Sequence, residues 1–200
     1  MACFVPADGD IGALAFDVGS MSTRAGFAGE EAPRAIFPST VCTWEDGADE
    51  TTTDVLECER DSHLSLAALA SAQARRVTSR MSPQGGVLDE AVFRALLEHG
   101  LRRLGSTSWA EHPVLLTEPI SASAATRRQT AELLFEDLGV PALCIAKSAE
   151  LVAIGVGRPT AVVLEVGAEA ATAAVVSDGA LVHRSVRRSA RLGGAALAKG

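Results

Sequence analysis

The sequence predicts a mixed α/β fold that contains two copies of one strand–turn–strand unit. Residues 12–19 (GALAFDVG) and 160–167 (TAVVLEVG) share an apolar strand followed by an acid, a valine and a glycine. Ala- and Leu-rich stretches with helical character separate the two copies. Hydrophobic residues make up 48% of the chain, which is enough for a substantial core. Strands that alternate with helices favour sheets covered by helices, and the repeat favours an internal duplication.

The first copy predicts a β-hairpin. Residues 11–16 form a short apolar strand that ends at Asp17, and a second strand-like piece covers residues 23–28. An acid, a glycine and a hydroxyl lie between them, as is typical of a turn. The sequence FPS at 37–39 ends this block. Residues 43–60 have almost no apolar periodicity, so we expect a solvated loop there.

Helices and two further strands are expected between the copies. Asp89 is a suitable N-cap for a helix with Val92, Leu96 and Leu97 on its apolar side, and Gly105 follows its end. In chain order, helices are predicted at 62–80, 89–104, 126–138 and about 148–154, a turn at 83–86, and strands at 113–117 and 142–146.

The charge distribution separates one segment from the rest of the chain. There are 25 acidic and 18 basic side chains, for a net charge of −7. Eight acids and one base lie between Glu45 and Asp61, so this stretch alone carries −7 and the other 17 acids and 17 bases cancel. Neutralising a nucleic-acid backbone requires clustered Lys and Arg. We therefore expect no direct contact with nucleic acid.

Other features exclude a membrane or a zinc site. No apolar run approaches the roughly 20 residues that span a bilayer. The first ten residues lack the basic region of a signal peptide, so we expect an intracellular protein with no membrane partner. The four cysteines and four histidines are scattered, without the spacing of zinc ligands. Reduced thiols are the expected state of these cysteines.

The turn at 17–20 (DVGS) is the sharpest local signal of a binding site. Gly19 lets backbone N–H groups approach a phosphate closely, and the Ser20 hydroxyl adds a donor. Asp17 suits a Mg²⁺ held through water beside a nucleotide. Arg24, on the returning strand, is in reach of the same phosphates. Ordinary hairpin turns have the same local spacing, so that interpretation stays open at this point.

The second copy offers Glu165 and Gly167 at the matching positions, with neither a hydroxyl nor a second acid. Two such hairpins facing each other would clamp a phosphate tail, with Asp17 and Glu165 as candidate metal ligands. The arginines within 184–191 and the pair at 127–128 are typical of solvated surface. The sequence shows no Ser/His/Asp or Cys/His arrangement of a catalytic site.

Four strings in the same order resemble the actin superfamily. The N-terminal one combines DVGS with RAGFAGEEAPRAIFPS on the returning side, and the others are EHPVLLTE, LFE followed by VPA, and GRPT. The resemblance implies an actin-like ATPase fold, with ribonuclease H-like duplicated mixed sheets and flanking helices. The strings lie at 11–39, 111–118, 134–142 and 157–160, and the resemblance covers about 11–41 and 81–194.

The resemblance also implies how the chain is divided. Residues 1–41 and 81–155 would form a first lobe, 42–80 an acidic and Ala-rich insert in place of the small subdomain, and 156–200 the start of a second lobe. A complete actin fold is nearly twice this length, so we expect only its N-terminal half. By the same resemblance, the residues that would bind ATP are Asp17, Gly19, Ser20, Arg24, Glu165 and Gly167, with Mg²⁺ at Asp17 and Glu165.

Departures from the actin pattern argue against hydrolysis. Ser148 stands where conventional actins have a Gln that orients the attacking water, and Lys147 precedes it. Ala168 replaces the second acid of the second turn, and Glu169 replaces a glycine. A carboxylate beside a triphosphate adds repulsion and bulk. We therefore expect weak or structural nucleotide binding and no enzymatic role.

The strings AKSA (146–149), GRP (157–159) and SVRRS (185–189) resemble a nuclear class, the fourth actin-related proteins of chromatin-remodelling and histone-acetyltransferase complexes. That class implies a non-polymerising scaffold in the nucleus, which binds a long helix of a remodelling ATPase and pairs with nuclear actin. The insert at 42–80 keeps none of the filament-contact pattern of actins. A conventional filament-forming actin of the cytoplasmic cytoskeleton is the alternative, and a sugar kinase or a heat-shock chaperone ATPase is a more distant one.

Overall fold

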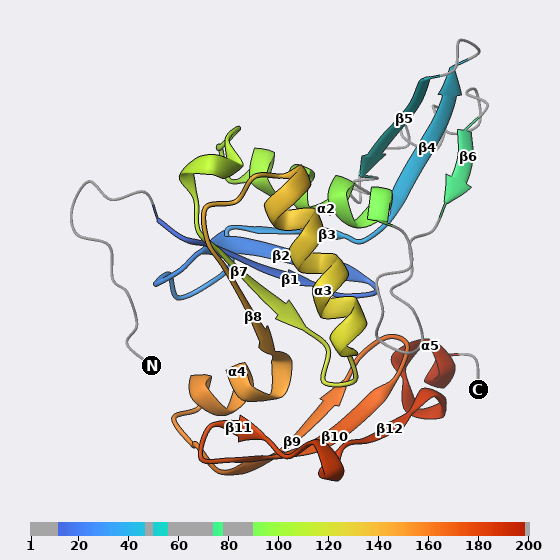
Figure 1. The fold of residues 1–200 in the computed structure, drawn as a ribbon. Coiled ribbons are helices and arrows are strands. Elements are labelled where there is room, and N and C mark those ends of the chain that lie inside the picture. The colour runs from blue at the N-terminus through green and yellow to red at the C-terminus, as the bar shows by residue number, and fades with distance from the viewer. Residues whose placement is uncertain (1–11, 47–49, 56–73, 78–89, 199–200) are drawn as a thin grey trace.

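The computed structural model describes residues 12–46, 50–55, 74–77 and 90–198 (Figure 1). The strands are β1 (Leu14–Val18), β2 (Ser22–Phe27), β3 (Ala35–Pro38), β4 (Val41–Asp46), β5 (Glu50–Val55), β6 (Ala74–Val77), β7 (Val114–Glu118), β8 (Leu143–Lys147), β9 (Ala161–Val166), β10 (Ala171–Ser177), β11 (Ala180–Leu181) and β12 (Arg187–Ser189). The helices are α2 (Glu90–Arg103), α3 (Ala124–Glu132), α4 (Ser148–Gly155) and α5 (Gly194–Leu197), with the short helical segments η1 (Trp109–Glu111), η2 (Leu133–Asp137), η3 (His183–Ser185) and η4 (Ala190–Leu192).

The first sheet has five strands in the order β3-β2-β1-β7-β8. β1 pairs antiparallel with β2 and parallel with β7, and β7 pairs parallel with β8. Parallel neighbours need a long crossover, and α3 lies in the one that joins β7 to β8. Side chains of β1 alternate between the core and more accessible positions, as the apolar pattern of this segment predicts.

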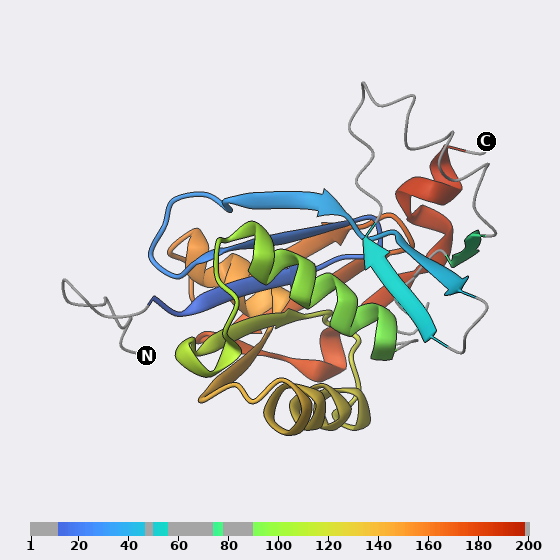
Figure 2. The ribbon, with the colours of Figure 1, turned by 90° about the horizontal axis from the view of Figure 1, so that it is seen from above.

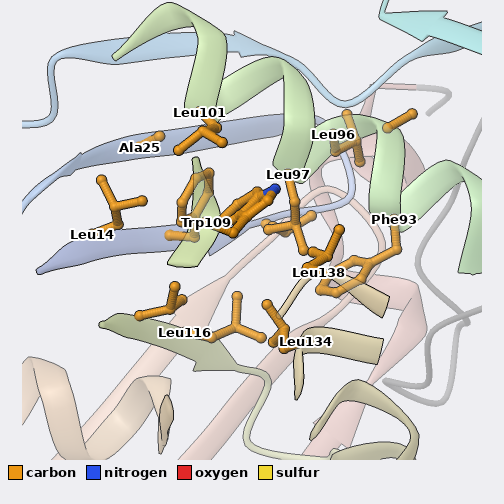
Figure 3. Close-up of a cluster of buried hydrophobic side chains, with 14 of the residues drawn as sticks. Leu14, Ala25, Phe93, Leu96, Leu97, Leu101, Trp109, Leu116, Leu134 and Leu138 are labelled. Carbon is orange, nitrogen blue, oxygen red and sulfur yellow. The ribbon is translucent and has the colours of Figure 1, made fainter. Parts of the chain in front are cut away.

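The main core lies between this sheet and the helices that cover it (Figure 3). Leu14 and Phe16 from β1 are almost fully buried there. They pack in one cluster with Leu97 from α2, Leu134 from η2 and Trp109 from η1. Figure 2 shows α2 running over the strands of the first sheet. This packing fixes the end of β1, where the DVGS turn begins.

The second sheet repeats the hairpin arrangement of the first. β9 pairs antiparallel with β10 as β1 pairs with β2, and β12 lies on the other side of β10 as β3 lies beside β2. The turn of each hairpin closes in the same way: the Gly19 N–H donates to Ser22 O (3.1 Å), and the Gly167 N–H donates to Ala170 O (2.9 Å). The expected duplication is therefore confirmed. We call residues 17–22 the first turn and residues 165–170 the second turn.

A smaller core joins α4 to the second sheet. It contains Ala149 and Ala153 from α4, Val163 from β9, and Ala174 and Val176 from β10. Since α4 follows directly after β8 of the first sheet, the chain crosses between the sheets at Lys147 and Ser148.

The expected solvated loop at 43–60 is wrong where the structure describes it. β4 and β5 form an antiparallel pair, and β6 joins β4 in a third sheet that stands apart from the other two in Figure 1. Acidic composition hid these strands, although three successive threonines at 51–53 have high β-propensity. Of the helix expected at 62–80, residues 74–77 are a strand instead, and 62–73 and 78–80 lie outside the described residues.

The other predicted elements that lie in the described part of the chain are present with small shifts at their ends. The helix expected at 89–104 is α2, although its predicted cap, Asp89, lies outside the described residues, as does the turn expected at 83–86. The helix expected at 126–138 is α3 continued by η2. Within the described part of the chain, no helix is long and apolar enough to cross a membrane.

Candidate functional site

A cavity of about 600 Å³ lies between the first and second turns, beside the start of α4. The two hairpins therefore face each other across one space, although they belong to different sheets and 147 residues of sequence lie between Asp17 and its counterpart Glu165. The cavity lining includes all six residues that the sequence indicated for a phosphate site: Asp17, Gly19, Ser20, Arg24, Glu165 and Gly167.

The first turn requires a glycine and presents donors to the cavity. A Cβ on Gly19 would lie 2.8 Å from Ser22 O, which is too close for any other residue without a backbone shift. The Gly19 N–H closes the turn and is not available to a ligand. In the described part of the chain, the Ser20 N–H has no protein acceptor. The hydroxyl and N–H of Ser20 are thus donors that this turn offers to the cavity.

Asp17 and Arg24 form an ion pair at the edge of the cavity. They are opposite each other in the β1–β2 register, and Arg24 Nη1 lies 3.0 Å from Asp17 Oδ2. Both side chains are about half exposed, so the pair is open to solvent and to ligands. A solvated pair of this kind contributes little to stability, which leaves both groups free to exchange partners.

Glu165 lies in the second turn and is perturbed by its surroundings. Burial raises the pKa of the Glu165 carboxyl, the nearby Ser148 hydroxyl lowers it, and the negative charge of Asp17 raises it. Ser148 Oγ is buried and has no hydrogen-bond partner within bonding distance in the described structure. The cavity thus contains the carboxylates of Asp17 and Glu165, which repel each other, and the buried Ser148 hydroxyl, which could still form a hydrogen bond.

Sequence comparison identifies the family in which this pair of hairpins occurs. A family model described as actin matches residues 8–200. The chain belongs to the actin family. It is 32% identical to the Oryza sativa subsp. japonica protein named actin-related protein 4, over 90% of this chain and 45% of the relative. It is 32% identical to actin-related protein 4 of Arabidopsis thaliana, over 92% of this chain and 46% of the relative.

A third relative has a more specific name. The chain is 28% identical to "SWI/SNF and RSC complexes subunit arp42" of Schizosaccharomyces pombe, over 92% of this chain and 41% of that protein. The chain spans about half the length of the curated relatives that it matches. These matches confirm the actin-like fold and the resemblance to the fourth actin-related protein class.

The donor set is compatible with Mg²⁺ beside a nucleotide. Members of the actin family generally bind ATP with Mg²⁺, and Mg²⁺ is usually held by one or two carboxylates together with phosphates and water. Asp17 and Glu165 supply two carboxylates to one cavity, where burial and, to a smaller extent, the charge of Asp17 raise the Glu165 pKa, and a cation there would favour the ionised carboxylates. No cluster of three or more metal-ligating side chains occurs among the described residues. Phosphate oxygens and water would have to complete the shell.

A buried ion network underlies the cavity wall at the start of α4. Lys147 Nζ lies 3.0 Å from Glu118 Oε1 and donates to Ala122 O (2.8 Å) and Pro119 O (3.3 Å). Arg127 also donates to Glu118, with its Nε 2.9 Å from Oε1, and this hydrogen bond raises the Arg127 pKa. The prediction of solvated surface at 127–128 therefore missed the contact of Arg127 with the buried Glu118.

Arg188 and Thr172 are among the lining residues that sequence reasoning missed. Arg188 was expected on a solvated basic face, and Thr172 was not singled out, yet both line the cavity. Thr172 is opposite Glu165 in the β9–β10 register, and Arg188 is opposite Thr172 in the β10–β12 register. The alternation of side chains along 171–173 and 187–189 could have indicated which residues share a face. That face can be assigned to the cavity only when the pairing of the strands is known.

Proposed function

We propose that this chain is a non-polymerising actin-related scaffold subunit of a nuclear chromatin-remodelling or histone-acetyltransferase complex, with weak or structural nucleotide binding and little or no ATP hydrolysis. One observation supports the nucleotide site above all: two equivalent turns, each with an acid and a glycine, line the same cavity. A hairpin that served only as a connection would not need its counterpart to face it.

The residues divide into those that bind phosphate and those that hold a metal. Ser20 and Arg24 would donate to phosphate oxygens, since a hydroxyl, an N–H and a guanidinium are suited to that chemistry. Asp17 and Glu165 would hold Mg²⁺ through water. When bound, Mg²⁺ neutralises phosphate charge. Arg24 would then leave Asp17 for the phosphate, because its present ion pair is solvated and weak.

The described residues that line the cavity include no Gln or Asn that could orient an attacking water. Ser148 has a short side chain whose buried hydroxyl is next to Glu165, and no amide is present there. Glu169 also lines the cavity and adds negative charge beside the place of the phosphates. General-base or water-positioning groups must lie within hydrogen-bond reach of the reacting water. Slow or absent hydrolysis is the expected consequence.

The proposed partners and location come from the relatives and from the sequence strings. Several relatives are named actin-related protein 4, and arp42 is named as a subunit of SWI/SNF and RSC complexes. By that resemblance the chain would bind a long helix of a remodelling ATPase and nuclear actin, in the nucleus. The insert at 42–80, with its excess of acids, would disfavour filament stacking by like-charge repulsion.

Two experiments test this function. Affinity purification of the tagged chain from nuclear extract should recover a remodelling ATPase or an acetyltransferase subunit, and recovery of neither would contradict the scaffold proposal. A pelleting assay with ATP and Mg²⁺ should leave the protein in the supernatant. Salt-induced filaments with phosphate release at the rate of conventional actin would instead support the cytoskeletal alternative.

A further inference from the structure

The two sheets place their basic cavity residue on different strands: the first sheet on the second strand of the hairpin, and the second sheet on the strand beyond it. In the first sheet, Arg24 on β2 is directly opposite Asp17. In the second sheet, Thr172 occupies the equivalent place opposite Glu165, and Arg188 follows on the next strand, β12. Residues opposite each other on neighbouring strands project from the same face of a sheet. Arg188 therefore lies on the cavity face, two strand spacings or about 10 Å from Glu165.

Arg188 differs from the arginines around it. Arg187 projects from the opposite face of β12 and donates to the carbonyl oxygens of Arg184 and Val186. Arg24 is paired with Asp17. The Arg188 side chain forms neither an ion pair nor a hydrogen bond with the described residues, although it lines the cavity. An unpaired guanidinium at a cavity wall is ready to meet an anion without first breaking an internal contact.

The charges of the second turn explain why a cation is needed there. Glu165 and Glu169 both line this side of the cavity, and the Asp17–Arg24 pair lines the side of the first turn. Arg188 is the only cationic side chain that the second sheet contributes to the cavity lining in the described structure. A phosphate tail between the turns would meet the Glu165 carboxylate on that side, and Arg188 is the cation of the second sheet that lines the same cavity.

We propose that Arg188 is a second phosphate contact of this cleft, so that the polyphosphate tail of a nucleotide lies between Arg24 of the first hairpin and Arg188 of the second. This inference rests on the proposed nucleotide-binding function. It assigns to β12 a role that the first sheet gives to β2. The guanidinium takes the place of the hydroxyl that the second turn lacks.

Calorimetric titration of the full chain with ATP and with inorganic tripolyphosphate tests the assignment. Arg188→Gln should weaken both ligands by about 10- to 100-fold, the loss expected for a hydrogen bond between charged groups. Arg188→Lys should restore part of the affinity. Arg184→Gln is the matched control, because it removes the same charge from an exposed residue outside the cavity lining and should leave both affinities unchanged. The urea midpoint should be the same in all variants.

The outcomes separate this inference from the proposed function. If the unchanged chain binds ATP and Arg188→Gln binds it equally well, the role of Arg188 is refuted and nucleotide binding stands. An equal loss in Arg184→Gln also refutes it, since the effect is then one of overall charge. If the unchanged chain binds neither ATP nor tripolyphosphate, the nucleotide-binding proposal fails, and the role of Arg188 fails with it.

Discussion

Replacing Glu118 by Gln should destabilise the fold more than any other single charge removal among the residues described above. Glu118 and Lys147 are each only 6% exposed, and their charged atoms are 3.0 Å apart. At an effective dielectric constant of about 20, two unit charges at this distance attract by about 5 kcal/mol. The substitution keeps the size of the side chain but leaves the Lys147 ammonium buried without a counter-charge.

The expected cost follows from what remains around Lys147. Breaking a buried ion pair by removing one partner typically costs 3–5 kcal/mol. Lys147 keeps two carbonyl acceptors, so we expect the lower end, about 3 kcal/mol for Glu118→Gln. Lys147→Met should cost less, about 1–2 kcal/mol, because Glu118 keeps its hydrogen bonds from Arg127. The double variant should cost about 2 kcal/mol less than the sum of the single variants.

Urea unfolding at neutral pH, followed by far-ultraviolet circular dichroism and tryptophan fluorescence, measures these differences. Glu132→Gln is the matched control, since Glu132 forms an ion pair with Arg128 on the exposed side of α3 and its loss should change the midpoint little. A cost below about 1 kcal/mol for Glu118→Gln, or single costs that simply add in the double variant, would refute the view that the buried pair is coupled.

Three further outcomes are expected. Gly193→Ala should lower the free energy of unfolding in urea by about 1–3 kcal/mol, because the added Cβ would lie 2.5–2.7 Å from the backbone of 168–170. Gly194→Ala should be tolerated, since its nearest neighbour would be 3.8 Å away. Equal costs for the two variants would contradict this expectation. The folded-state pKa of Glu165 is raised, so its contribution to the free energy of unfolding is present below the ordinary value of 4.5 and is lost as the pH rises through the folded-state pKa. Glu165→Gln should therefore flatten this part of the pH profile of unfolding. An unchanged profile would contradict the pKa shift. Ser148→Gln should not give phosphate release near the rate of conventional actin, as a coupled-enzyme assay can show, because the second turn still lacks its second acid; a rate near that of actin would show this loss to be harmless.

Local sequence patterns were sufficient for the hairpins and for most helices. The alternation of apolar residues in 12–19 and the glycine after each acid indicate a strand and a turn within a few residues of chain. The apolar face of α2 has the same local character. Five of the six candidate site residues were found in this way, because each acid lies two residues before its glycine and Ser20 follows the first glycine, whereas Arg24 was found on the returning strand. That they bind a nucleotide stays a prediction.

Long-range pairing decided what the patterns missed. β4 and β5 are strands in a strongly acidic segment because each supplies the hydrogen bonds that the other needs. Arg188 enters the cavity because β12 pairs with β10 in a register that local sequence does not reveal. Arg127 and Lys147 share Glu118, although α3 lies between β7 and β8 in the chain. Charge alone made such residues indistinguishable from surface arginines and lysines.

The sequence by itself determined the family, the repeated hairpin and the chemical groups at each turn, since these depend on neighbouring residues and on matching strings. Only the tertiary structure decided that the two turns share one cavity, that the Gly19 N–H is used within its turn, and that a buried lysine fixes the start of α4. The physical reason is the same in each case. Burial, strand register and the meeting of two sheets depend on contacts between residues that are far apart in the chain.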